Sequence, residues 1–154
     1  MSNEAALAVP RAVPFSTTLE VRDHCLCLHV QRAARILARL FDEALRPLGL
    51  TNQQFSLLMS LNRPEPPTLG PVAELLGMDR TTLTAALKPL ERRGLLQVQP
   101  DAKDRRSRRL SLTTEGLALL ARAMPIWRRI HGEIDERLES VDGHAIRSTL
   151  AALR

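Results

Sequence analysis

The chain has 154 residues, of which 44% are hydrophobic and 25% are charged, the balance of one ordinary globular domain with its own core. The sequence holds no apolar run long enough to span a bilayer and no secretory h-region, which excludes a membrane partner and predicts a cytoplasmic location. Two cysteines without an export signal exclude a disulfide framework, and the near absence of aromatic residues favours helices rich in Leu and Ala.

The first 18 residues hold two prolines and no hydrophobic periodicity, which predicts a flexible arm over residues 1–18 and a single domain over residues 19–154. Apolar side chains then recur once per helical turn and predict one long amphipathic helix over residues 19–48, ended by Pro47 and Gly49. Its apolar stripe comprises Leu26, Val30, Ala33, Leu37, Leu40, Ala44 and Leu48.

A capping box predicts the next helix, because Thr51 precedes it and Gln54 stands at its third position. Several prolines then break the chain, and Thr68 is the expected cap of another helix. The inner face of the helix after Thr51 is expected to carry Phe55, Leu58, Met59 and Leu61.

The residues after Thr68 have the spacing of a helix-turn-helix. Ala73 lets two helices approach, Gly77 supplies the positive φ of a tight turn, and Leu83 fills the space between the helices. Asp79 is expected to cap the second helix. Pro89 removes one backbone hydrogen bond inside that helix and predicts a bend.

Alternating residues over Leu95–Gln99 and Arg109–Leu112 predict two strands joined by a basic loop. Eight basic and three acidic residues lie from Lys88 to Arg109, an excess equal to the formal charge of +5 of the whole chain. Such a cluster is typical of a surface that binds a polyanion, and by itself it is as typical of a solvated charged face. Its place beside a helix-turn-helix favours DNA, because the two together form a winged helix-turn-helix, expected over residues 51–112.

A last helical region is predicted over residues 114–154, with a kink at Pro125 and a final helix from Asp142. With residues 19–48 it offers more apolar surface than a small winged helix covers, which predicts a dimerisation base. The expected fold class is therefore mainly α with a small β-hairpin wing.

The chain from Leu19 onwards resembles the MarR family of bacterial transcriptional regulators. The resemblance is carried by L-G-M-D-R-T-T-L-T, by L-E-R-R-G-L from Leu90 to Leu95, and by D-R-R-S-R-R-L-S-L-T-T-E-G from Asp104. It implies a homodimer whose base is made by the first and last helices. It also implies that Arg106 reaches into the minor groove and that Asp104 orients basic side chains of the wing.

The residues themselves suggest the same partner, double-stranded DNA. A helix fits the major groove, Thr and Arg can read base edges there, and Arg suits a narrow minor groove. Each Thr is alternatively a cap or an exposed surface residue. The candidate DNA contacts are Thr68, Arg80, Thr81, Thr82, Thr84, Lys88, Arg105 and Arg106.

His24, Cys25, Cys27 and His29 form a second chemically suggestive group. On one helix the two thiols would point about 200° apart and could not form a disulfide. Three interpretations stay open: packed apolar cysteines, a redox sensor, and a metal site that needs further ligands such as His131. The resemblance implies peroxide sensing by a cysteine near this place in some members, which use Tyr hydroxyls that this chain does not have.

The resemblance also implies a small aromatic or phenolic effector bound between the dimer base and the DNA-binding lobe. Candidate lining residues are His29, Arg32, Phe55 and Met59. The sequence holds no catalytic motif, and no metal or cofactor is expected. The predicted function is a homodimeric repressor released from a pseudo-palindromic operator by such an effector. The alternatives are a thiol switch on the same scaffold and a winged-helix module that binds an acidic protein.

Overall fold

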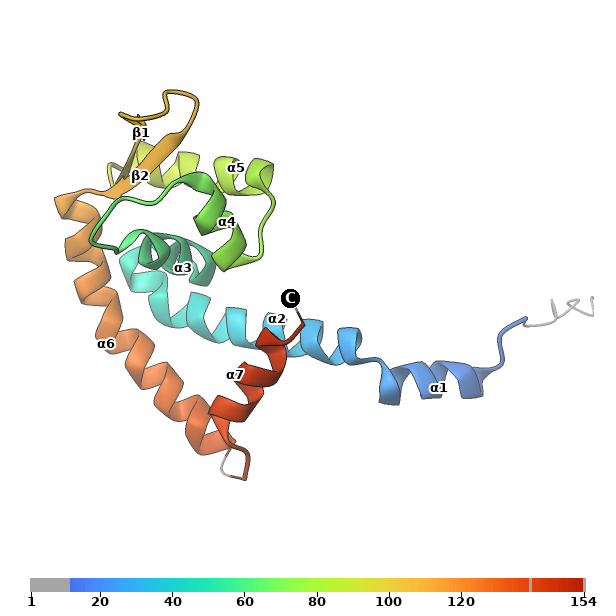
Figure 1. Ribbon diagram of the computed structural model, residues 1–154. Helices are drawn as coiled ribbons and strands as arrows, with labels where there is room; N and C mark the ends of the chain where they lie inside the picture. The colour runs from blue at the N-terminus through green and yellow to red at the C-terminus, as the bar shows by residue number, and fades with distance from the viewer. Residues whose placement is uncertain (1–11, 139, 154) are drawn as a thin grey trace, which may run out of the picture. The chain divides into compact units, whose positions relative to one another are not determined.

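The computed structural model describes residues 12–138 and 140–153 (Figure 1). The chain divides into two compact units, Met1–Leu37 and Ala38–Arg154, and the boundary falls inside the second helix. The elements in chain order are α1 (Phe15–His24), α2 (Leu26–Leu45), a 3₁₀ turn (Arg46–Leu48), α3 (Asn52–Leu61), α4 (Leu69–Leu76), α5 (Arg80–Arg92), β1 (Leu96–Pro100), β2 (Arg108–Leu112), α6 (Thr114–Arg137) and α7 (Gly143–Ala151).

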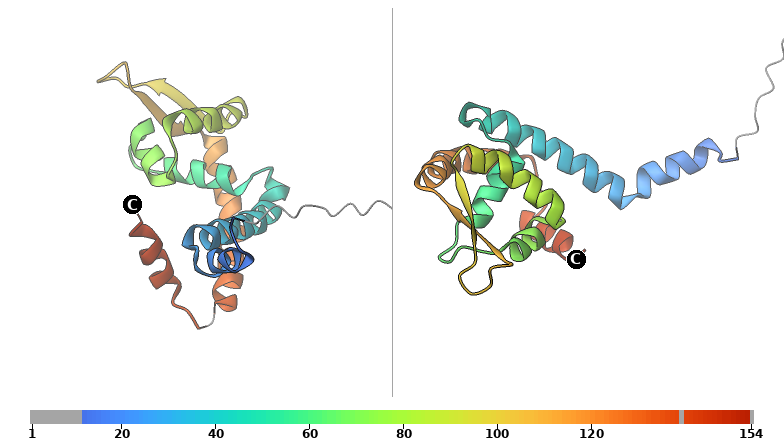
Figure 2. Two further views of the ribbon diagram at one scale, coloured as in Figure 1. Left: turned by 90° about the vertical axis from the view of Figure 1, so that its right-hand side faces the viewer. Right: turned by 90° about the horizontal axis from the view of Figure 1, so that it is seen from above.

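The second unit is organised around α3, with α4 and α5 on one side and α6 along another (Figures 1 and 2). Side chains from the end of α2, from α3 to α5, from both strands and from α6 meet in one apolar core. The bulkiest members with almost no exposed surface are Leu45, Leu57, Leu58, Leu83, Leu90, Leu96, Leu110 and Val72. Burial of these side chains fixes the α4–α5 pair and the hairpin against a common support.

The helix-turn-helix has the predicted turn. Gly77 takes a left-handed conformation with φ 63°, and Leu83 is fully buried beside Ala73. Asp79 caps α5 by accepting a hydrogen bond from the backbone N–H of Thr82 at 2.8 Å. The capping box of Thr51 and Gln54 at α3 is also confirmed. The helix α5 continues through Pro89 to Arg92.

The hairpin is antiparallel, and its strands lie within one residue of the predicted ranges. Val98 pairs with Leu110, whose side chain is completely buried. The segment before α4 lies along the other edge of β2, because the N–H of Leu110 donates to the carbonyl of Pro67 at 2.9 Å. The hairpin is therefore attached to the start of α4.

The first unit departs from two predictions. A helix begins at Phe15, so the predicted arm over residues 1–18 is wrong for its last four residues; residues 1–11 lie outside the described chain. The predicted single helix over residues 19–48 is interrupted at Cys25, which has an extended backbone with φ −74° and ψ 101°. Its Sγ accepts the N–H of Leu28 at 3.4 Å and so occupies the cap position of α2.

No helix of the described residues is long and apolar enough to cross a membrane.

Gly116 lies in the first turn of α6, directly against the backbone of Leu95, the residue before β1. A Cβ built on Gly116 overlaps the backbone carbonyl oxygen of Leu95, which cannot yield as a flexible side chain would. We therefore expect Gly116→Ala to lower the free energy of unfolding by about 1–3 kcal/mol in urea titrations. The matched control is Gly132→Ala in the same helix, where nothing lies within 4 Å of the built Cβ.

Gly132→Ala is expected to raise the free energy of unfolding by about 0.4–1 kcal/mol, because alanine has the better helix propensity. Equal effects of the two substitutions would contradict the close approach of α6 to Leu95.

Candidate nucleic-acid interface

The outer face of α5 is exposed along its whole length. Leu83, Leu87 and Leu90 are buried on the inner face, which leaves the opposite face to solvent. The exposed positions at helical spacing include the predicted contacts Arg80, Thr81, Thr82, Thr84 and Lys88, together with Ala85. The structure thus brings five of the predicted residues onto one helix.

Two of the threonine hydroxyls on this helix already have protein partners. The Thr82 hydroxyl donates to Asp79 at 2.6 Å, and the Thr84 hydroxyl donates to the carbonyl of Arg80 at 2.7 Å. The bond from Thr82 is the main reason that the pKa of Asp79 lies below its usual value. For Thr82 the alternative interpretation as part of a helix cap therefore has direct support, while Thr84 is an exposed residue.

Thr68 stands at the N-terminus of α4, as predicted, but its side chain makes no capping hydrogen bond. The prediction that its hydroxyl caps this helix is wrong. Its backbone pairs with Arg109 of β2 in an isolated antiparallel bridge, which holds the residue in an extended conformation beside the hairpin. The hydroxyl is left for another partner at a helix N-terminus, where an anion is favoured.

The loop between the strands is closed by backbone hydrogen bonds at its base. The N–H of Asp101 donates to Ser107 at 3.0 Å, and the N–H of Ser107 donates to the carbonyl of Asp104 at 2.9 Å. The Asp104 carboxylate accepts the backbone N–H of Arg106 at 3.0 Å. In this structure Asp104 therefore shapes the backbone of the tip, whereas the resemblance implied that it orients basic side chains.

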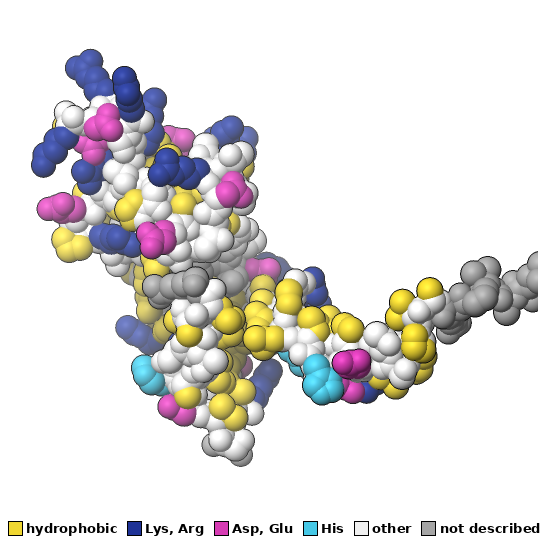
Figure 3. Space-filling model, turned by 45° about the vertical axis from the view of Figure 1, so that its right-hand side comes forward, with side chains coloured by type: hydrophobic (Ala, Val, Ile, Leu, Met, Phe, Trp, Pro, Cys, Tyr) yellow, Lys and Arg dark blue, Asp and Glu magenta, His cyan; other side chains and the backbone are white. Residues whose placement is uncertain are grey.

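Basic side chains gather at the hairpin end of the molecule (Figure 3). Arg105 and Arg106 are exposed at the tip, with Lys103 and Arg108 beside them. Within the described residues none of these four cations is in an ion pair, because the salt bridges there involve Arg22, Arg109 and Arg129. The wing thus presents unneutralised positive charge to its surroundings.

Asp101 and Arg109 are the residues of this region that sequence reasoning missed. Asp101 is 6% exposed, and its carboxylate accepts the N–H of Lys103 at 2.7 Å and the Nε of Arg109. These two hydrogen bonds hold the pKa of Asp101 below its usual value, and the bond from Lys103 has the larger effect. The carboxylate is therefore ionised near neutral pH. The available signal was an Asp at the end of one strand and an Arg in the facing strand.

The cysteines lie in the first unit, on either side of the start of α2. Cys25 is half-buried between two helices, and Cys27 is exposed. The predicted obstacle to a disulfide, two thiols within one continuous helix, is therefore absent. His29 and Arg32 are exposed on α2 in the same unit. No group of three metal-ligating side chains occurs in the part of the chain that the structure describes.

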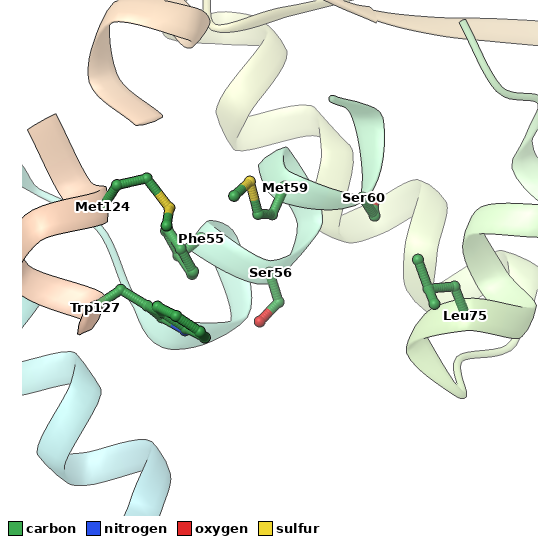
Figure 4. A pocket seen from close by; sticks show the side chains of 7 residues that line it. All are labelled: Phe55, Ser56, Met59, Ser60, Leu75, Met124 and Trp127. Atoms are coloured by element: carbon green, nitrogen blue, oxygen red, sulfur yellow. The ribbon is translucent and has the colours of Figure 1, made fainter. Parts of the chain in front are cut away.

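A pocket of about 380 Å³ opens in the second unit between α3, α4 and α6 (Figure 4). It includes two predicted lining residues, Phe55 and Met59, and it does not include His29 or Arg32. The full lining is Phe55, Ser56, Met59, Ser60, Leu75, Met124 and Trp127. The site is thus apolar and aromatic, with two hydroxyl groups and no charged side chain.

The aromatic wall of the pocket packs against further rings that do not line it. The Trp127 ring stacks on His131 at a centroid distance of 3.9 Å, and His131 also lies 5.1 Å from the ring of Phe41. The Ser60 hydroxyl donates to the carbonyl of Leu57 at 2.6 Å. Ser56 has no hydrogen-bond partner for its hydroxyl among the described residues, so it can bind a ligand.

Comparisons with known proteins agree with this architecture. The MarR family model matches residues 50–107, which cover α3 to the wing. The transcriptional activatory protein BadR of Rhodopseudomonas palustris is 33% identical in a 113-residue alignment that covers 71% of this chain and 65% of BadR. The chain thus spans slightly less than two thirds of that relative.

Solved structures extend the likeness over more of the chain. The M. tuberculosis transcriptional regulator MosR, in a crystal structure with DNA, is 41% identical with a TM-score of 0.75 over 84% of this chain and 92% of MosR. The transcriptional repressor CouR, bound to a 23-mer DNA duplex, is 33% identical with a TM-score of 0.66 over 83% of this chain and 88% of CouR. BadR and MosR are both named as transcriptional proteins, one an activatory protein and the other a transcriptional regulator. The chain belongs to the MarR family of transcriptional regulators.

Proposed function

We propose that this chain is a homodimeric DNA-binding repressor that acts in the cytoplasm, where it meets duplex DNA. The observation that carries the proposal is the exposed outer face of α5 at the same end of the unit as the unpaired cations of the wing (Figures 2 and 3). The helix enters the major groove through Arg80, Thr81 and Lys88. The tip arginines reach the adjacent minor groove.

The relatives support DNA as the partner, because MosR and CouR are both described in complex with DNA. The relatives differ in the direction of regulation, since CouR is a repressor and BadR is an activatory protein. We propose repression for this chain, which requires only that the dimer occupies its operator.

Apolar side chains at both ends of the chain support the dimer. Large hydrophobic residues that a monomer leaves exposed occur on α1, α2 and α7, and such patches mark interaction surfaces. They are Phe15, Val21, Leu26, Leu28, Ile36, Leu37 and Leu150. A second copy covers all of these except Phe15 when residues 19–48 and 114–154 of two chains form the dimerisation base, with the lobe over residues 51–112 left free.

DNA binding is tested by fluorescence anisotropy with a duplex from the region upstream of the chain's own coding sequence. We expect an affinity that falls steeply with salt, because phosphate contacts release counterions. No binding to this duplex or to an unrelated one at 50 mM salt would refute the proposal. It would favour the acidic-protein module instead.

The apolar pocket supports a small aromatic effector. Its volume of about 380 Å³ lies within the range of ligand sites, and its wall is made by Phe55, Met59 and Trp127. The free Ser56 hydroxyl offers one hydrogen bond, while no charged side chain lines the site to neutralise a carboxylate. We therefore propose a neutral phenol in preference to an aromatic acid.

The single tryptophan of the chain lies in this pocket, so its fluorescence reports on binding directly. We expect a saturable change in Trp127 fluorescence with simple phenols, and benzoate is expected to bind at least about 10-fold more weakly because its charge would be buried unpaired. Saturating phenol should also lower the affinity for DNA.

A matched pair of serine variants tests the hydrogen bond. Ser56→Ala should weaken phenol binding about 3- to 10-fold, the value of one hydrogen bond. Ser60→Ala should leave it nearly unchanged, because that hydroxyl is already bonded to Leu57. Tighter binding of benzoate than of phenol would contradict the assignment.

A thiol switch is the second candidate, and the helix break at Cys25 favours it. In this reaction hydrogen peroxide accepts two electrons and two protons from the thiols of Cys25 and Cys27, which form a disulfide while the peroxide becomes two water molecules. A disulfide at this place would stiffen the junction of α1 and α2, which we place in the dimerisation base.

We expect one equivalent of peroxide to lower the mass of the wild-type chain by about 2 Da and its DNA affinity by at least about 10-fold, reversibly with dithiothreitol. The double variant Cys25→Ser, Cys27→Ser should bind DNA as the wild type does, and peroxide should not change its DNA affinity. Release of the double variant by peroxide would show that these thiols are not the sensor.

A further inference from the structure

Arg109 differs from the other cations of the wing because its guanidinium is held by the protein. Its Nε donates to the Asp101 carboxylate, and its Nη1 donates to the carbonyl oxygen of Pro66 at 2.7 Å. Asp101 directly follows β1, and Pro66 belongs to the loop before α4. One side chain therefore joins the base of the wing loop to the entry of the helix-turn-helix.

Backbone contacts strengthen the same connection. The N–H of Leu110 donates to Pro67, and Thr68 pairs with Arg109 in an antiparallel bridge. Thr68 directly precedes α4, and α4 packs against α5. The wing is thus fixed to the start of α4, which packs against α5. Arg109 takes part in both the side-chain and the backbone links.

Asp101 links Arg109 to the loop at the tip of the wing. Its buried carboxylate accepts the backbone N–H of Lys103 and, at 3.4 Å, that of Asp104. These residues lead directly into Arg105 and Arg106. The ion pair between Asp101 and Arg109 therefore determines where the loop that carries the tip arginines leaves the hairpin.

We infer that Asp101 and Arg109 are a positioning pair that sets the tip arginines relative to α5, and that Arg109 does not itself bind DNA. The inference rests on the proposed DNA binding, and it assigns different roles to different cations of the wing. Arg105 and Arg106 make contacts, while Arg109 determines their position.

Epistasis separates positioning from contact. Arg109→Gln should lower affinity for the upstream duplex at least about 10-fold in the wild-type chain. In the background Arg105→Ala, Arg106→Ala it should change affinity less than about 2-fold, because no tip contact is left to position. The matched control is Arg108→Gln, an exposed neighbour on the same strand, whose effect should be equal in both backgrounds.

Two further variants keep the test independent of overall stability. Arg109→Lys keeps a charge for Asp101 but cannot hold both partners in the same planar geometry, so its loss should be smaller than that of Arg109→Gln. Asp101→Asn keeps an oxygen acceptor for the loop amides and loses the ion pair. The double variant Asp101→Asn, Arg109→Gln should bind DNA no more than about 2-fold more weakly than either single variant.

Equal losses from Arg109→Gln in both backgrounds would overturn the inference, because a DNA contact or a general destabilisation of the lobe both predict that result. Unchanged affinity of Arg109→Gln in the wild-type chain would overturn it as well and would leave the proposed function intact. Absence of salt-dependent DNA binding by the wild-type chain would refute the proposed function itself.

Discussion

Replacing Arg105 and Arg106 with alanine is expected to lower the affinity for operator DNA by at least about 100-fold. Each dimer loses four arginines, and an arginine that contacts a base or phosphate contributes about 1–3 kcal/mol. Neither side chain is in an ion pair within the described chain, so its full charge is available to DNA. The slope of log affinity against log salt should decrease in magnitude by about 3 to 4.

The matched control for this variant is Arg129→Ala. Arg129 is exposed on α6 and paired with Glu133 at 2.6 Å, so its removal lowers the net charge without touching the wing or α5. We expect less than about a 3-fold change in affinity. A similar loss in both proteins would mean that DNA responds to overall charge and that the wing has no special role.

The substitution Ala85→Glu is expected to abolish specific DNA binding, with a loss of more than about 100-fold. Ala85 is exposed in the middle of the outer face of α5, between Thr81 and Lys88. A carboxylate there would face the phosphates of the major groove, and juxtaposed like charges cost several kcal/mol. Glutamate is a good helix former, so circular dichroism should show an unchanged total helix content.

Ala121→Glu is the control for Ala85→Glu, because it makes the same change at an exposed position of α6. It should bind the operator within about 3-fold of the wild type. Specific binding by Ala85→Glu at wild-type affinity, measured by anisotropy at 150 mM salt, would exclude α5 as the helix in the major groove.

Local rules were sufficient to predict the helix-turn-helix. The cap at Asp79, the capping box at Thr51 and the left-handed Gly77 each depend on residues within a few positions of one another. Leu83 was predicted as core because burial follows the helical period. The winged helix fold followed from these signals together with the alternating strands.

Contacts between distant segments were not predictable in the same way. The bond from Arg109 to Pro66 joins residues 43 positions apart, and composition alone assigns Arg109 to the basic surface of the wing. Periodicity also missed the break at Cys25, because the predicted apolar stripe begins only at Leu26 and the residues before it show no apolar pattern that could locate a break. Both features depend on backbone placement, which hydrophobic spacing does not encode.

The candidate pocket was predicted in part for a similar reason. Phe55 and Met59 were recognised as the inner face of α3, but their partners Met124 and Trp127 come from α6, more than sixty residues away. His29 and Arg32 were also predicted to line a ligand site, and they remain predictions on the exposed surface of α2. The pocket that the structure describes favours a neutral ligand instead.

The most direct test of the central claim measures stoichiometry and salt dependence together, by analytical ultracentrifugation and anisotropy with the upstream duplex. We expect two chains per operator duplex and an affinity that falls at least about 100-fold between 50 and 200 mM salt. A single chain per duplex, or an affinity that does not change with salt, would contradict a dimer that presents two basic wings to DNA.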